Sequence, residues 1–144
     1  MERRLALVTG ATSGLGLETA KGLAARGWDL VLACRDAGKA NAVAHGISAA
    51  SPSIKLETPH LDLASLKSID AFAAELSRRR ERLDLLINNA GVFCDTRRLT
   101  AEGFEMTIGV NFLGTLALTR RLLPLLVGGG AGGNGARIVR PLTK

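Results

Sequence analysis

The residues best suited to chemistry stand close together near the N-terminus, in the segment TGATSGLG at positions 9–16. Glycines at 10, 14 and 16 let a backbone turn sharply and let a ligand approach without meeting a Cβ atom. If a helix starts here, its free N–H groups face that ligand, and a pyrophosphate suits such donors. An ordinary strand-to-helix turn is the alternative interpretation. The predicted phosphate-contacting residues are Gly10, Thr12, Ser13, Gly14, Leu15 and Gly16.

Strand-like and helix-like segments alternate along the chain, and they place this loop between the first strand and the first helix. Residues 3–10 form an apolar run closed by glycine, which is typical of a fully buried parallel strand. Residues 14–26 carry apolar side chains at helical spacing, and Gly27 is a natural stop. Asp36 is placed to cap the second helix. Further strands are expected at 29–35, 54–63, 83–91 and 136–139, and further helices at 37–50, 65–76 and 104–127.

This alternation predicts an α/β fold, namely a Rossmann-like doubly wound parallel sheet with helices on both faces. About five strands are expected, with the sheet incomplete at its C-terminal side. The glycine-rich stretch 128–135 is expected to be a flexible connector before the last strand. No domain boundary is visible, so residues 1–144 are predicted to form a single domain.

Charge and cysteine usage exclude several classes of protein. The net charge is +6, but the basic residues are scattered, and the densest run, Arg78 to Arg80, is expected at a solvated helix end rather than on a nucleic-acid surface. The two cysteines, Cys34 and Cys94, lie far apart, which predicts neither a disulfide scaffold nor a metal site.

No targeting or membrane segment is expected from the sequence. The longest apolar stretch, 112–127, is interrupted by Arg120 and Arg121 and is shorter than the ~18 uncharged residues of a membrane helix. Arg3 and Arg4 lead directly into the first strand rather than into a leader sequence. A cytoplasmic location is therefore expected.

Further motifs follow the glycine loop in an order that resembles the short-chain dehydrogenase/reductase family. The loop has the spacing Gly-x-x-x-Gly-x-Gly, and the segments LACRD and DLASL are similar to those of retinol-dehydrogenase-like reductases. The resemblance implies a dinucleotide-binding sheet with its site at the carboxyl ends of the strands. It also implies an adenine contact, a motif closing the fourth strand and a catalytic asparagine. The matching residues are Asp62 and Leu63, then Asn89, Ala90 and Gly91 of NNAG, and finally Asn111.

The choice of cofactor depends on the end of the second strand. Family members that prefer NAD(H) carry an acidic residue there, which accepts hydrogen bonds from the ribose hydroxyls. This chain has Cys34 followed by Arg35. A guanidinium can hold a 2′-phosphate through forked, charge-assisted hydrogen bonds. NADP(H) is therefore predicted over NAD(H), with Asp36 assigned to helix capping.

The family's acid–base residues are missing from the sequence. Family members use a tyrosine as general acid and base, with a lysine four residues later, and a serine that orients the substrate oxygen. The 144 residues contain no tyrosine, and Asn111 is the only matching member of that group. Thr143 and Lys144 are not expected to replace the serine and the lysine. Hydride transfer by this chain alone is therefore not expected.

Two alternatives to an oxidoreductase follow from this gap. The chain could be a non-catalytic protein that retains the nucleotide or pairs with another chain through helix 104–127, or a product that does not fold stably. Pairing or self-association is expected because the helix would lose part of its apolar cover. That face comprises Phe112, Leu113, Leu116, Leu122 and Leu123.

Overall fold

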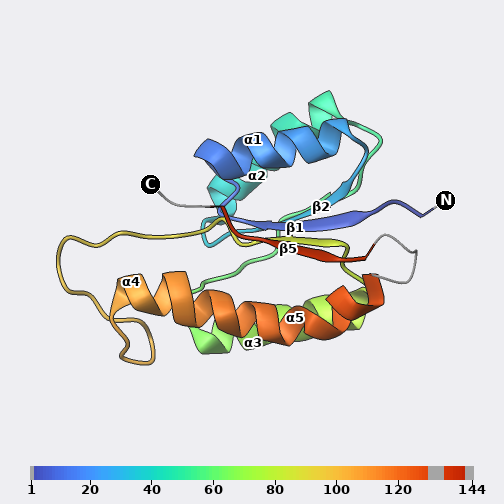
Figure 1. Ribbon diagram of the computed structural model, residues 1–144. Helices are drawn as coiled ribbons and strands as arrows, with labels where there is room; N and C mark the ends of the chain where they lie inside the picture. The colour runs from blue at the N-terminus through green and yellow to red at the C-terminus, as the bar shows by residue number, and fades with distance from the viewer. Residues whose placement is uncertain (1, 130–134, 142–144) are drawn as a thin grey trace.

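The computed structural model describes residues 2–129 and 135–141 and has a parallel sheet between two layers of helices (Figure 1). The five strands lie in the order β3-β2-β1-β4-β5. Helices α1 and α2 cover one face, and α3 and α5 cover the other (Figure 1). The predicted doubly wound α/β architecture is therefore confirmed. The elements are β1 (Leu5–Thr9), α1 (Gly14–Ala25), β2 (Asp29–Ala33), α2 (Ala37–Ala50), β3 (Leu56–Glu57), α3 (Leu66–Arg79), β4 (Leu85–Ile87), α4 (Met106–Ile108), η1 (Gly109–Gly114), α5 (Thr115–Gly129) and β5 (Arg137–Val139).

The core is organised around β1, all five residues of which are buried. Successive side chains of a strand point to opposite faces of its sheet. Leu5 and Leu7 accordingly pack into the cluster between the sheet and helices α3 and α5. Ala6 and Val8 pack into the cluster on the opposite face, between the sheet and helices α1 and α2. The continuous apolar run in the sequence thus reflects a strand that is covered on both sides.

Several strands are shorter than the sequence pattern predicts. The third strand was expected over 54–63, but regular pairing covers only Leu56–Glu57. Pro59 follows, and a proline has no N–H to give to a ladder. Pairing resumes only as a single bridge between Cys34 and His60. The strands expected at 29–35 and 83–91 also end early, at Ala33 and Ile87, so the polar residues that follow them lie outside the regular strands.

The long helix predicted over 104–127 is composite. It begins at Met106, where the carboxylate of Glu105 accepts a hydrogen bond from the N–H of Ile108. The π-helical segment η1 comes next, and α5 then continues through Pro124 to Gly129. A Cβ atom at Gly114 would lie 2.2 Å from the carbonyl oxygen of Leu63, so a close backbone approach requires glycine there.

The predicted exposed face of this helix is only partly correct. Phe112, Leu116 and Leu123 are exposed, as expected, and Leu113 is partly buried. Leu122 is fully buried in the core cluster that α5 shares with α3, so its prediction was wrong. Leu116 and Leu122 both belong to α5, where a spacing of six residues places their side chains on different sides of the helix, and the side of Leu122 faces the core.

The predicted connector at 128–135 is also corrected at its start. Its first two glycines belong to α5. A Cβ atom at Gly129 would lie 2.2 Å from the carbonyl oxygen of Leu83, so the helix end approaches the backbone before β4 closely. Residues 130–134 of the connector lie outside the described residues, as do Thr143 and Lys144.

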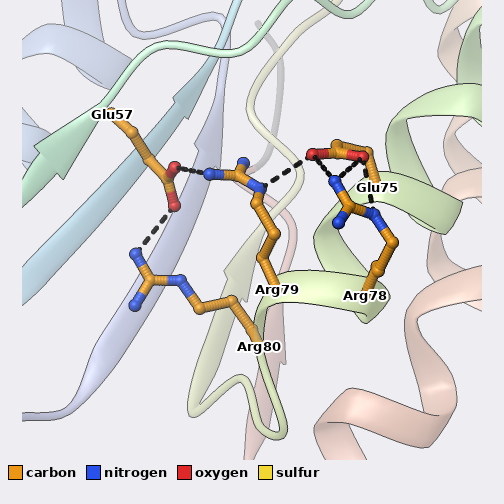
Figure 2. A network of polar contacts seen from close by, with 5 residues as sticks. All are labelled: Glu57, Glu75, Arg78, Arg79 and Arg80. Carbon is orange, nitrogen blue, oxygen red and sulfur yellow. Dashed lines mark hydrogen bonds and ion pairs between the residues drawn. The ribbon is translucent and has the colours of Figure 1, made fainter.

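The arginine run closes α3 with an ion-pair network (Figure 2). Glu57 on β3 accepts hydrogen bonds from Arg79 at 2.7 Å and from Arg80 at 2.9 Å, and Arg78 forks onto Glu75. Burial raises the pKa of Glu57, but the hydrogen bonds from the two guanidinium groups outweigh burial and lower it. The run therefore does lie at a helix end, and it joins that end to the edge of the sheet rather than standing free in solvent.

The helical stretch Met106–Gly129 is long and apolar enough, by length and composition alone, to cross a membrane. In this structure one side of it, including Leu118 and Leu122, is fully buried in the core. The absence of a membrane segment and the cytoplasmic location both stay predictions.

Candidate functional site

A cavity of about 680 Å³ opens at the carboxyl ends of β1, β2 and β4. This is the edge at which α1 begins (Figure 1). The fold thus collects segments far apart in the sequence into one wall. The sequence-predicted residues that line the cavity are Gly10, Thr12, Ser13, Arg35, Asp62, Leu63, Asn89, Ala90 and Gly91.

The glycine loop has the backbone that its sequence predicts. Gly10 and Gly14 have φ angles of +67° and +57°, which side chains other than glycine rarely adopt. The space where a Cβ of Gly14 would point is open. A Cβ at Gly16 would lie 2.4 Å from the carbonyl oxygen of Gly10, so this glycine permits the turn to close on itself.

The start of α1 suits an anionic ligand. Ser13 is the N-cap residue, yet its side chain makes no capping hydrogen bond, and it lines the cavity together with Thr12. The first N–H groups of a helix lack intrahelical partners and attract phosphate. Gly14, Leu15 and Gly16 belong to this turn but do not line the cavity, and Leu15 is 60% exposed.

Thr9 is a site residue that none of the sequence motifs marks. Its buried Oγ1 accepts hydrogen bonds from the N–H groups of Asn89 at 3.1 Å and Ala90 at 3.0 Å. Asn89 in turn donates from Nδ2 to the carbonyl oxygen of Gly10 at 3.0 Å. These bonds join the end of β1 to the NNAG turn. The signal in the sequence was a hydroxyl at the end of an otherwise apolar run.

The end of β2 places two cations on the cavity wall, Arg35 and Lys39. Asp36 lies between them and also lines the cavity, and its Oδ1 accepts a hydrogen bond from the N–H of Lys39 at 3.0 Å and caps α2. The capping role predicted for Asp36 is confirmed. Lys39 was not among the predicted site residues, although it is a second basic residue about one helical turn after Arg35. Burial raises the pKa of the neighbouring Cys34 thiol, which keeps it protonated and weakly reactive.

Asn111 lies beside the cavity rather than on its wall. It belongs to η1, and its side-chain amide contacts Val92 twice. Oδ1 accepts from the N–H of Val92 and Nδ2 donates to the carbonyl oxygen of Val92, both at 2.8 Å. Val92 itself lines the cavity. Asn111 therefore positions the loop that follows NNAG, and its predicted catalytic role stays a prediction.

The arrangement can hold an elongated ligand with anionic groups. The helix start and the glycine loop face its centre, and the two cations lie at one end. Acid–base chemistry has no donor here of the kind that the resemblance implies, since the sequence contains no tyrosine.

Comparison with known proteins identifies the family. The sequence model of the short chain dehydrogenase family matches residues 4–140. Human retinol dehydrogenase 13 is 49% identical over 120 residues, which cover 83% of this chain and 36% of that protein. Mouse polyprenol dehydrogenase is 45% identical over 136 residues, covering 94% of this chain and 41% of that protein.

Among solved structures, the alcohol dehydrogenase of the archaeon Thermococcus sibiricus, complexed with 5-hydroxy-NADP, superimposes with a TM-score of 0.81 at 27% identity. That match covers 96% of this chain and 57% of the archaeal chain. This chain thus spans between about a third and three fifths of the proteins it matches. The family match, the sheet order and the glycine loop agree, and the chain belongs to the short-chain dehydrogenase family.

Proposed function

We propose that this chain binds NADP(H) in the cavity at the strand ends, as the cofactor-holding part of an oxidoreductase. The family reaction would be hydride transfer between NADP(H) and an alcohol or carbonyl compound. The single observation that carries the cofactor choice is the wall at the end of β2. Arg35 and Lys39 both line the cavity there, and Asp36, which lies between them on the same wall, uses one carboxylate oxygen to cap α2.

This wall favours a phosphate over a ribose hydroxyl. Arg35 supplies a planar fork of donors and Lys39 supplies a compact positive charge, and both suit the 2′-phosphate of NADP(H). NAD(H) would meet the carboxylate of Asp36, which also lines the cavity, but one oxygen of that carboxylate is held by the cap of α2 and two cations flank it. The archaeal relative that carries an NADP derivative supports the same choice.

The 144 residues on their own are proposed to bind the cofactor without turning it over. Proton transfer to or from the reacting oxygen needs a positioned group of suitable pKa. The family uses a tyrosine for this, and the sequence contains none. A non-catalytic nucleotide-binding role is the alternative that this absence favours.

Thermal unfolding tests the binding proposal. NADPH at a concentration about 100-fold above its Kd should raise the Tm by roughly 5–10 °C, because a ligand that binds only the folded state adds about 2.7 kcal/mol to its stability. NADH at the same concentration should raise the Tm less. A carbonyl-reduction assay with NADPH on the same preparation should show no turnover.

Each result has a contrary outcome. If neither dinucleotide shifts the Tm, the chain does not bind the cofactor. A larger shift with NADH would refute the interpretation of the β2 wall. Clear turnover by the 144-residue chain would refute the importance given to the missing tyrosine.

A second proposal concerns the exposed side of the composite helix, and we infer that it mediates self-association. Exposed apolar side chains recur at spacings of four and seven residues along the composite helix, and exposed apolar surface of this kind can mark an interaction surface. Val127 is 78% exposed and Phe112 is 55% exposed. The strip comprises Ile108, Phe112, Leu116, Leu123 and Val127.

Size-exclusion chromatography with light scattering tests this second proposal. Leu116→Glu should shift the chain from dimer to monomer at micromolar concentration, because a carboxylate cannot be buried unpaired in an apolar interface. Leu99→Glu is the matched control, since Leu99 is similarly exposed but lies in the loop before α4. A wild-type chain that is monomeric throughout, or two variants that behave alike, would contradict self-association through this strip.

A further inference from the structure

Arg140 occupies a defined position where the chain leaves the sheet. It directly follows β5, at the same edge of the sheet as the start of α1 (Figure 1). Its Nη2 donates a hydrogen bond to the carbonyl oxygen of Asn111 at 2.9 Å. Among residues 2–129 and 135–141, no carboxylate forms an ion pair with it. The guanidinium therefore brings a positive charge to η1 that no carboxylate of the described residues compensates.

This charge lies close to the cavity wall. Asn111, which accepts the hydrogen bond, holds Val92 through both atoms of its side-chain amide. Val92 and Val110, the residue before Asn111, both line the cavity. Arg140 itself does not line the cavity, but the residue whose carbonyl oxygen it binds is adjacent in sequence to Val110 and hydrogen-bonded to Val92, both on the wall on the side of β4. Arg35 and Lys39 stand at the opposite side, at the end of β2.

The two sides would receive different halves of a dinucleotide. In a doubly wound sheet, the pyrophosphate lies at the first glycine loop and one nucleotide extends to each side of it. If the cations at β2 hold the adenosine phosphate, the nicotinamide half lies over the ends of β4 and β5. This step rests on the proposed NADP(H) binding.

We propose that Arg140 makes this site selective for the reduced form of the cofactor. The oxidised nicotinamide ring carries a positive charge, whereas the reduced ring is neutral. A guanidinium remains charged at any physiological pH, so it repels only the oxidised ring. The chain then binds NADPH more tightly than NADP⁺, by about three- to tenfold at low ionic strength.

Titration calorimetry with NADPH and NADP⁺ tests this proposal on the full chain. Arg140→Gln removes the charge but keeps an N–H donor for the Asn111 carbonyl. It should tighten NADP⁺ binding, leave NADPH binding nearly unchanged and bring the ratio of the two Kd values close to one. Arg140→Lys keeps the charge and should keep the wild-type ratio. Arg137→Gln is the control, because it removes an equal, exposed charge from the other end of β5.

The outcomes separate this proposal from the cofactor assignment. Equal ratios of Kd in the wild type and in Arg140→Gln would overturn the role of Arg140 while leaving NADP(H) binding intact. If Arg140→Lys also brings the ratio of the two Kd values close to one, the hydrogen bond to Asn111 matters rather than the charge. That result would overturn the proposal as well. A wild-type chain that binds neither form would overturn the proposed function and this inference with it.

Discussion

Replacing Thr9 with valine should lower the free energy of unfolding by about 2–4 kcal/mol and abolish NADPH binding. Valine has nearly the shape of threonine, so the packing of the end of β1 is kept. The N–H of Ala90 loses its acceptor, however, and the N–H of Asn89 keeps only the carbonyl oxygen of Ile87. Thr9 is 1% exposed, so water does not replace the hydroxyl readily. The NNAG turn, which forms part of the cavity wall, would then be released from β1.

Urea denaturation and the NADPH-induced Tm shift measure the two effects separately. Thr9→Ser is the matched control, because it keeps the hydroxyl and loses only a methyl group. The serine variant should retain NADPH binding and most of the stability. If valine and serine reduce both quantities equally, the methyl group rather than the hydrogen bonds holds this junction.

The substitution Arg35→Asp should weaken NADPH binding by about 10- to 100-fold, which corresponds to the roughly 1.5–3 kcal/mol of a charge-assisted hydrogen bond. A carboxylate would repel the 2′-phosphate and would also partly neutralise the neighbouring Lys39. NADH binding should be retained or improved, because the new carboxylate can accept hydrogen bonds from the ribose hydroxyls. The preference between the two cofactors would then be reversed.

Fluorescence titration of NADPH and NADH against the variant measures that preference. Lys67→Asp makes the same change of charge on α3, at an exposed position that does not line the cavity. This control should change both affinities little and equally. NADPH binding that survives Arg35→Asp unchanged would place the 2′-phosphate elsewhere, with Lys39 the first alternative to examine.

The parts of the site that could be predicted from sequence are those set by local chemistry. Gly10 and Gly14 adopt positive φ angles because the turn between β1 and α1 demands them, and that demand is readable in the glycine spacing. Asp36 caps a helix that begins at the next residue. In both cases the residue and its partner lie within a few positions of each other.

Residues whose partners are distant could not be placed in this way. Thr9 bonds to Asn89 and Ala90, which are 80 and 81 positions away, so its importance depends on β1 and β4 being neighbours. Lys39 could not be assigned to the site from sequence, because only the fold places the start of α2 at the cavity wall. Leu122 was placed on the wrong side because its burial depends on α3, which packs against α5 and is distant in the sequence.

By itself, the sequence determined the α/β architecture, the glycine loop, the family and the absence of tyrosine among its 144 residues. Periodicity and turn chemistry depend on residues close together in the chain, so they can be recognised without knowledge of the fold. The tertiary structure alone decided which side chains share the cavity wall, where Asn111 points and what Arg140 contacts. Those outcomes depend on the order of strands in the sheet, which brings distant chain segments to one edge.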